Sequence, residues 1–410
     1  MNAPLLKTTL SAQTSAGSTE LIEVRGRVVA HDALSLLLSD EGGTLRVTCA
    51  SEELIDGSWV RAIGVMQEGV LRCTSLGVET VPLASYPRAG GDVRWFHDET
   101  RKRLSALIQR GAILREIRSY FNHSDFVEVE TPQMVPSPGL DVHLEAFEIG
   151  NRRRDGLAYY LHTSPEYQMK RLLVAGLPRV MQICRASRRG ELGQRHEPEF
   201  TMLEWYRAFA GSEDVMRDSE EMVALVAMAV LGQTKVTGPR GNEIDLAAPW
   251  DRMTVQQAFT QLAGIEVDDV LPDEEKFFLI LTETIEPQLG RNKPVFLTEW
   301  PASMASLART FPDRPHLADR FEAFVDGMEL CNGFGELVDP VEQRSRFLRD
   351  QKKRREMGLA VYPLDERFLS ALEEGMPPSG GNALGVDRLV MLLTGAARIE
   401  DCVAFGAERI

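Results

Sequence analysis

The sequence predicts an α+β protein in which a small β-barrel precedes a larger domain of strands and helices. Short alternating runs separated by Asp and Gly turns occupy the first part of the chain, and helical and extended patterns follow one another in the rest. At 410 residues with 43% hydrophobic residues, the chain can bury one large core and one small one. We expect a disordered lead over residues 1–19, a barrel over 20–85, a linker over 86–99 and the large domain over 100–410.

The barrel is predicted by short, mostly alternating runs that turn residues separate. These runs cover residues 24–29, 35–38, 44–48, 59–65 and 70–74. Strands of this number and length fit a barrel of the OB type. OB barrels often bind nucleic acid, but this one offers few aromatic side chains for base stacking. A structural or docking role is therefore expected at least as strongly as RNA binding.

The larger domain opens with a helix over 103–121, whose apolar residues have helical spacing, and an extended segment over 126–132 that Pro132 ends. Further helices are expected at about 212–232 and at 340–357. The last of these should face solvent, because its basic residues leave only a thin apolar stripe. These residues are Arg344, Arg346, Arg349, Lys352 and Lys353.

The formal net charge of -15 disfavours nonspecific binding of polyanions unless a local basic patch overrides it. Basic clusters do occur, at residues 152–154, at Arg185, Arg188, Arg189 and Arg195, and at residues 352–355. We expect the first and third clusters to be solvated faces. The second should face a phosphate, since it lies among the polar motifs described below.

The cysteines and the apolar runs exclude other classes of protein. Cys49, Cys73, Cys184, Cys331 and Cys402 form no Cys-x-x-Cys pair, so we expect reduced thiols, mostly buried, and neither a zinc site nor a disulfide framework. The longest apolar runs are too short to cross a bilayer, and no signal peptide pattern opens the chain. A cytoplasmic location without membrane contact is therefore expected.

Polar residues interrupt apolar surroundings in segments 200–206, 329–336 and 379–389. Formation of an acyl-adenylate needs cations against the phosphates of ATP and acids that hold magnesium. Glu322 and Glu329 lie seven positions apart on a strand that continues through a turn. If both are buried they repel each other and need a cation, for which Mg²⁺ is the natural choice; if exposed, they are ordinary surface acids.

These segments resemble the catalytic domain of a class II aminoacyl-tRNA synthetase of the lysyl type, an antiparallel sheet flanked by helices. The helix, strand and Pro132 resemble the first class II signature, which builds the dimer interface in that family and implies a homodimer. Segment 188–206 resembles the second signature, which implies that Arg188 grips the α-phosphate, His196 lies near the outer phosphates and Phe200 stacks on adenine. Arg388 resembles the arginine of the third signature, which meets the γ-phosphate. The resemblance completes the ATP site with Arg189, Gly190, Glu197, Glu329, Leu330 and Gly385, and it assigns magnesium to Glu322 and Glu329.

The same resemblance implies an amine-bearing substrate. Glu166, Tyr206 and Glu336 match positions that hold the amino acid and its side-chain ammonium in lysyl enzymes, and Asn332 would orient its other end. Ser164 and Ala383 replace the Ala and Gly of ordinary lysyl enzymes. Both changes are shared with the ligases of this family that attach β-lysine to a lysine of bacterial elongation factor P, which the chain resembles from about Leu104 to its end.

Some features depart from these patterns. The family's Phe-Arg-Asn-Glu is here 187–190, Ser-Arg-Arg-Gly, and Glu197 replaces the Asn after the histidine. The glutamate that usually meets adenine is therefore absent, although Glu191 is one position away. Three hypotheses follow: a ligase that acts on elongation factor P with lysine or β-lysine, a compact lysyl-tRNA synthetase that charges tRNA, or a noncatalytic paralogue.

Overall fold

The computed structural model describes residues 6–7, 20–40, 43–49, 54–96, 102–150, 156 and 158–410. Most of the expected lead over 1–19 and the basic cluster at 152–154 lie outside the described residues. The chain divides into two compact units, Met1–Ile108 and Gln109–Ile410. None of the described helices is long and apolar enough to cross a membrane.

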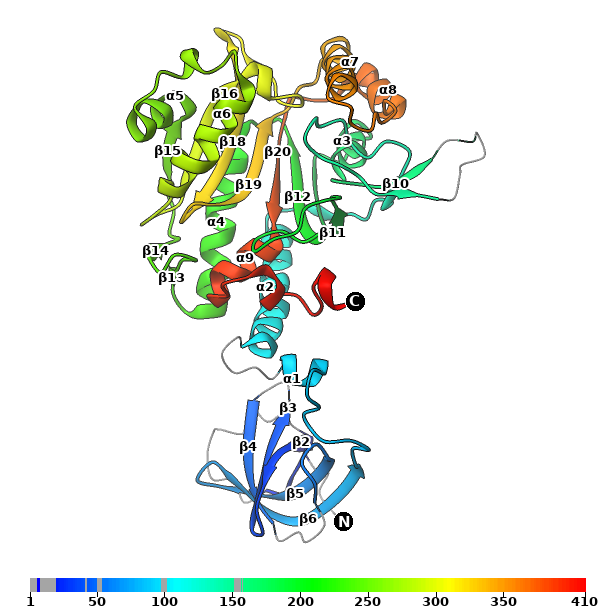
Figure 1. Cartoon of the computed structure of the whole chain (residues 1–410), viewed down its shortest axis with the longest axis vertical. Helices are drawn as coiled ribbons and strands as arrows, with labels where there is room; N and C mark the ends of the chain where they lie inside the picture. Colours follow the sequence, from blue (N-terminus) through cyan, green and yellow to red (C-terminus); the bar gives the residue numbers. More distant parts are fainter. Residues whose placement is uncertain are drawn as a thin grey trace. The chain divides into compact units, whose positions relative to one another are not determined.

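The first unit contains a closed ring of strands (Figure 1). Its members are β2 (Ile22–His31), β3 (Ser35–Asp40), β4 (Gly43–Thr48), β5 (Trp59–Gln67) and β6 (Val70–Thr80), in the order β2-β3-β4-β6-β5 with β5 returning to β2. A short strand β1 (Leu6–Lys7) lies parallel to β2. The predicted OB-like barrel is confirmed, and each predicted run lies within one of its strands.

The alternation of buried and exposed residues along the strands explains why this segment forms a barrel. Along β5, Val60 and Ala62 are fully buried, while the residues beside them are partly or fully exposed. The β5–β6 hairpin turns through Glu68 and Gly69, which both have positive φ. This two-residue turn matches the right-handed twist of the flanking strands. A short helix α1 (Asp92–Phe96) follows the barrel.

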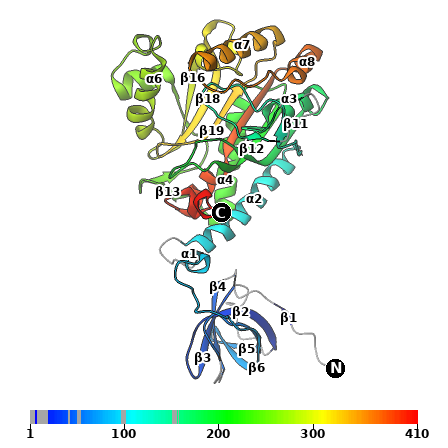
Figure 2. The ribbon, with the colours of Figure 1, turned by 45° about the vertical axis from the view of Figure 1, so that its right-hand side comes forward.

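The second unit is built on one large sheet, in the order β15-β16-β18-β19-β20-β12-β11-β7. Its strands are β15 (Asp251–Thr254), β16 (Val295–Pro301), β18 (Arg314–Val325), β19 (Met328–Gly335), β20 (Ser379–Gly385), β12 (Glu199–Ala208), β11 (Arg179–Ser187) and β7 (Val127–Glu128), and β17 (Thr310–Phe311) pairs with β18. In Figures 1 and 2, β20 lies between β19 and β12, although it is the last strand of the chain.

The centre of this sheet is antiparallel, as expected, but its outermost pairs, β15–β16 and β7–β11, are parallel. Parallel neighbours need a crossover connection, and here helices supply it. Helix α3 (Glu166–Val174) lies between β7 and β11 in the sequence, and α5 (Val255–Ala258) and α6 (Glu274–Ile280) lie between β15 and β16. The extended segment predicted over 126–132 is a strand only at Val127–Glu128.

Helices cover the sheet and its surroundings in separate apolar clusters. Helices α2 (Arg103–His123), α4 (Ser212–Leu231) and α9 (Val386–Thr394) share one core with the middle strands. Helices α3, α7 (Pro340–Glu356) and α8 (Glu366–Gly375) share another, and α7 and α8 lie side by side in Figures 1 and 2. Shorter strands β8 (Met134–Val135), β9 (Glu148–Ile149) and β10 (Tyr159–Leu161) form a small sheet, and β13 (Lys235–Thr237) pairs with β14 (Glu243–Asp245).

The expectation that α7 faces solvent was wrong for part of its surface. Arg354 is fully buried, and so is most of Arg346. The Arg354 guanidinium donates hydrogen bonds to the carbonyl oxygens of Asp141, Val142, Leu144 and Ala360. A guanidinium can be buried where carbonyl groups accept its N–H groups, so a charge count alone does not show which helix face is solvated.

Candidate active site

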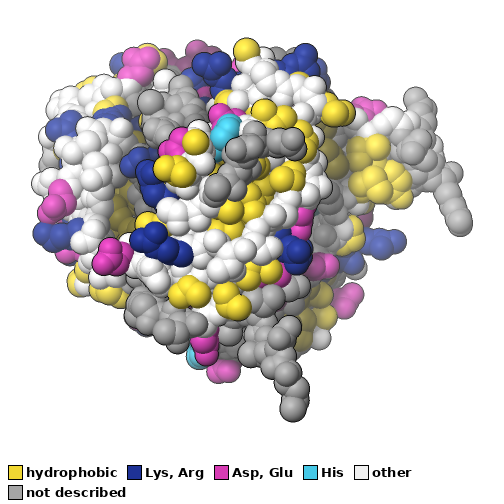
Figure 3. Space-filling model, turned by 90° about the horizontal axis from the view of Figure 1, so that it is seen from below, with side chains coloured by type: hydrophobic (Ala, Val, Ile, Leu, Met, Phe, Trp, Pro, Cys, Tyr) yellow, Lys and Arg dark blue, Asp and Glu magenta, His cyan; other side chains and the backbone are white. Residues whose placement is uncertain are grey.

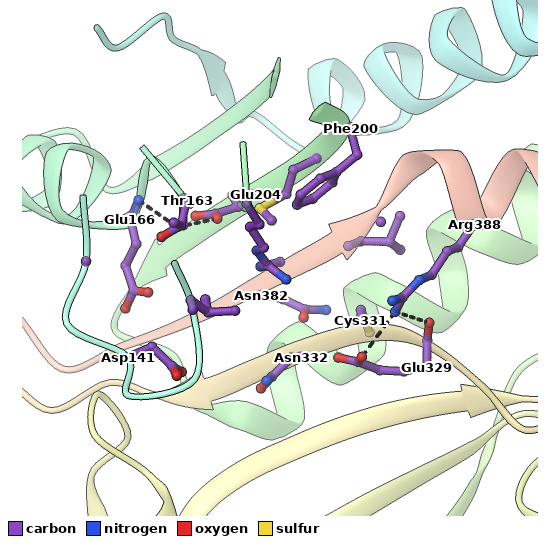
Figure 4. A pocket seen from close by; sticks show the side chains of 18 of the residues that line it. Asp141, Thr163, Glu166, Phe200, Glu204, Glu329, Cys331, Asn332, Asn382 and Arg388 are labelled. Atoms are coloured by element: carbon purple, nitrogen blue, oxygen red, sulfur yellow. Dashed lines mark hydrogen bonds and ion pairs between the residues drawn. The ribbon is translucent and has the colours of Figure 1, made fainter. Parts of the chain in front are cut away.

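A cavity of about 280 Å³ opens on the sheet surface formed by β12, β19 and β20 (Figure 4). Alternation along β12 creates it: Leu203 and Trp205 enter the core shared with α4, whereas Met202, Glu204 and Tyr206 line the cavity. The segment 138–144 and the start of α3 line its other side. One sheet thus presents an apolar face to its helices and a polar face to the cavity.

Cations gather at one end of the cavity. Arg388, on the first turn of α9, donates from Nη1 to the backbone oxygen of Glu329 (2.9 Å) and to its carboxylate (3.1 Å). Its Nη2 lies 2.7 Å from Nε2 of His196. Because a guanidinium can only donate, this His196 nitrogen accepts and carries no proton. Burial and the neighbouring Arg388 both lower the pKa of His196, which favours the neutral ring.

The other predicted nucleotide residues lie beside this cluster. The Arg188 guanidinium stacks 5.0 Å from the ring centre of Phe200, and Arg188 lies 3.6 Å from the carboxylate of Glu191. Burial opposes ionisation of Glu329, but Arg388 outweighs it and lowers the pKa of that carboxyl. Glu197, Leu330 and Gly385 also line the cavity. Most of the predicted ATP set is therefore brought together.

Four predicted residues do not line the cavity: Arg189, Gly190, Glu322 and Glu336. The Arg189 side chain is 67% exposed and approaches Glu145 instead. Glu322 is buried on β18, on the same sheet face as Asn332, where it pairs with Arg320 at 2.5 Å and accepts from Asn332. Burial raises the pKa of Glu322 to about 8, against the lowering effect of Arg320. Of the predicted phosphate-facing arginines, Arg188 and Arg195 line the cavity, while Arg185 pairs with Glu199.

The opposite end of the cavity carries acids. Figure 4 shows Glu166 and Glu204 there, well away from Arg388. Ser164 donates to one oxygen of Glu204 (2.6 Å), and the hydroxyl of Tyr206 donates to the other (2.8 Å). Burial raises the pKa of Glu204 to about 7. Of the predicted substrate residues, Ser164, Glu166, Tyr206, Asn332 and Ala383 line the cavity.

Glu336 lies just behind this end, fully buried, and pairs with Nζ of Lys170 at 2.5 Å. Lys170 also pairs with Glu166, one helical turn earlier on α3. Gly381 makes this packing feasible, because a Cβ there would lie 2.3 Å from both the Glu336 carboxylate and the Tyr206 ring. The acids of this end therefore share one internal ammonium group.

Ala383 lies in the floor between the two ends. In the sheet register it is paired with Glu204 on β12 and with Asn332 on β19. Paired residues of neighbouring antiparallel strands point to the same face. The Ala383 methyl group therefore fills space between the carboxylate of Glu204 and the amide of Asn332.

The sequence analysis did not assign several residues of this site. Glu204 and Lys170 stand at the acidic end, Glu191 beside Arg188, and Glu286 near Glu329. Burial, and then the Glu329 carboxylate, raise the pKa of Glu286 to about 7. Glu204 could have been predicted, because alternate residues of a strand point to the same face and Glu204 is two positions from Tyr206. No sequence motif around Glu286 indicated that it lies near the site.

Comparisons with known proteins match most of the chain. The family model for tRNA synthetases class II (D, K and N) matches residues 92–409, which contain the whole cavity and none of the barrel strands. The chain is similar to the elongation factor P--(R)-beta-lysine ligase of Salmonella arizonae, with 41% identity over 310 residues that cover 74% of this chain and 95% of that protein. The protein of the same name from an Enterobacter species is 40% identical over 310 residues, with the same coverage.

Proposed function

We propose that this chain, which belongs to the class II (D, K and N) tRNA synthetase family, activates lysine or (R)-β-lysine with ATP. It then transfers the acyl group to a lysine side chain of elongation factor P. The observation that carries the proposal is the similarity to elongation factor P--(R)-beta-lysine ligases over 95% of their length. The cavity supports it, because cations at one end and carboxylates at the other suit a nucleotide and an amine.

Activation takes place at the cationic end. The carboxylate of the amino acid attacks the α-phosphorus of ATP, and pyrophosphate leaves. Arg188 and Arg388 stabilise the negative charge that develops on the phosphates, and Phe200 offers an aromatic face to adenine. Glu191, which lines the cavity next to Arg188, supplies a carboxylate where the altered signature has Gly190.

Magnesium fits this site only together with the phosphates. Among the described residues no group of three His, Cys, Asp or Glu side chains is placed to hold a metal ion. Glu329 lines the cavity. Glu322 and Glu286 lie close enough for the charge of the Glu329 carboxylate to raise the pKa of each. Mg²⁺ is usually bound by one or two carboxylates plus substrate phosphates, and it neutralises phosphate charge when bound.

The acidic end holds the amine of the substrate. Glu166 and Glu204 face the cavity, and the Tyr206 hydroxyl fixes one oxygen of Glu204. Buried acids reject apolar side chains, since these would leave the carboxylates without a partner. After activation, the acceptor amine attacks the carbonyl carbon of the adenylate, an amide bond forms and AMP leaves.

A protein acceptor suits the charge of the chain better than tRNA does. Between residues 20 and 86 the barrel region has ten acidic and five basic residues, which opposes binding of a phosphate backbone. On the face shown in Figure 3, Lys and Arg side chains are scattered among acidic and hydrophobic ones. The barrel itself favours the tRNA-charging alternative, because OB folds bind oligonucleotides.

The test offers both acceptors to the same enzyme. Purified protein is incubated with ATP, Mg²⁺, elongation factor P, tRNA, and either lysine or (R)-β-lysine, and both acceptors are analysed by mass. We expect elongation factor P alone to gain one acyl group. Arg388→Ala is the control and should lose at least about 100-fold in rate, since it removes a phosphate-facing cation. Charging of tRNA alone would overturn the proposal in favour of a synthetase, and no activation of any amino acid would favour the noncatalytic paralogue.

A further inference from the structure

The strongest unexplained feature is a lysine buried at the acidic end of the cavity. Lys170 is fully buried on α3. Its ammonium group pairs with Glu166 on the same helix and, at 2.5 Å, with Glu336 after β19. The rings of Tyr206 and Phe368 each lie 5.9 Å from its Nζ. A buried ammonium is costly unless it is paired, so this geometry fixes Lys170 in its charged form.

The number of acids exceeds the number of internal cations. Glu166, Glu204 and Glu336 surround this end, and among the described residues that contact these acids or Lys170 there, only Lys170 is a base. Burial, with smaller contributions from the carboxylates of Glu166 and Glu204, raises the pKa of Glu336 to about 8 against the lowering effect of Lys170. Burial opposes the charge of Lys170, but Glu166 and Glu336 outweigh it and raise its pKa. With all three carboxyl groups ionised, this end is thus two cations short.

We propose that Lys170 is a built-in counter-ion that neutralises one carboxylate of the acidic end and leaves the others to receive the ammonium group of the substrate. The inference rests on the proposed function, because it assigns one of the missing cations to the substrate amine. Lys170 does not line the cavity, so it is a positioning residue that acts through Glu166 and Glu336. Without it, the buried acids keep their protons and hold the amine poorly.

The direction of the pH effect follows from this assignment. In a Lys170→Met variant the acids keep their protons to higher pH in the folded state, whereas in the unfolded chain they ionise near pH 4. Folded carboxyl groups with a raised pKa contribute stability that is lost as pH rises through that pKa. The variant should therefore fall further behind the wild type in melting temperature as pH increases.

The experiment measures melting temperatures and lysine-dependent pyrophosphate exchange between pH 5.5 and 8.5. For Lys170→Met we expect the gap to the wild type to widen by roughly 5 °C or more over this range. The acidic limb of kcat/KM for lysine should move upward by about one pH unit, mainly through KM. Lys352→Met, which removes an exposed lysine of α7, is the matched control and should change neither.

A second variant separates charge from packing. Lys170→Met combined with Glu336→Gln removes one charge of each sign, and we expect it to recover most of the lost melting temperature at pH 8.5. A gap that is constant with pH, or no recovery in the double variant, would overturn the assignment even if the wild type acylates elongation factor P. A wild type without exchange activity would remove the substrate role, while the melting temperatures would still decide whether Lys170 is the counter-ion.

Discussion

We propose that the methyl group of Ala383 sets the choice between two substrates. It stands in the cavity floor between Glu204 and Asn332. The amino group of α-lysine lies on the carbon next to the carboxylate, and that of β-lysine lies one carbon further along. A methyl group beside the first carbon therefore disfavours α-lysine more than β-lysine.

Ala383→Gly should shift preference towards α-lysine. We expect a change of about 1 to 3 kcal/mol in the ratio of the two specificity constants, the range for one methyl-sized difference in a pocket. The measurement is pyrophosphate exchange with both amino acids on the wild type and the variant. A wild type that already prefers α-lysine and charges tRNA, with a glycine variant little different, would contradict this role.

Some residues of the site could be read from the sequence and others could not. Arg388, His196 and Phe200 were predicted from the resemblance of their segments to the class II signatures, and all three line the cavity. Arg189 was assigned by position alone, yet its side chain is 67% exposed and turned towards Glu145. Lys170 and Glu336 belong to elements distant in sequence, so the ion pair between them had no local signal.

At the scale of elements, α7 fixes one wall of the cavity. Arg354 of this helix binds the carbonyl oxygens of Asp141, Val142 and Leu144, and the cavity is lined by Asp141 and Leu144. The hydroxyl of Tyr362 accepts from the backbone N–H of Ala146 at the end of the same segment. A helix that looks charged in sequence is therefore a support for the substrate cavity.

Arg354→Met should loosen this wall. The change leaves buried carbonyl oxygens without donors, which we expect to lower the free energy of unfolding by about 3 to 5 kcal/mol and to raise KM for the amino acid. Denaturant unfolding and hydrogen exchange of residues 138–146 measure the two effects. Arg355→Met, at the exposed neighbouring position, is the control, and equal effects of the two substitutions would argue against a specific role.

Helices and strands were predicted correctly where the period of the apolar residues and the length of the segment indicated the same type of element. The strands of the barrel follow from alternation, and α4 follows from an apolar stripe with Gly211 and Gly232 at its ends. The strand over 126–132 was predicted too long, because pairing with β11 is limited to Val127 and Glu128. Alternation shows that a segment is extended, but only a partner strand decides how far a ladder continues.

At the scale of the whole molecule, the second unit has features of a homodimer subunit. Strand β7 exposes Val127, and Met134 is exposed on β8. Strand β7 is also an end strand of the large sheet. Strand β7 lies in the segment that resembles the first class II signature.

We expect the protein to be a homodimer at micromolar concentration, with one active site in each subunit. Exposed apolar residues next to an edge strand favour an isologous contact. Light scattering should give twice the chain mass of 45.7 kDa. Val127→Glu with Met134→Glu should shift the mass to that of a monomer, whereas Leu348→Glu on α7 should not; a monomeric wild type would contradict the prediction.

The position of β20 has a consequence for biosynthesis. It fills the middle of the large sheet, between β12 and β19, but it follows both of them in the sequence. Until residue 385 is made, the two neighbouring strands present unpaired edges that invite wrong partners. The nascent chain therefore cannot acquire a binding-competent cavity before β20 is made, and chains truncated before β20 should be strong clients for chaperones and proteases.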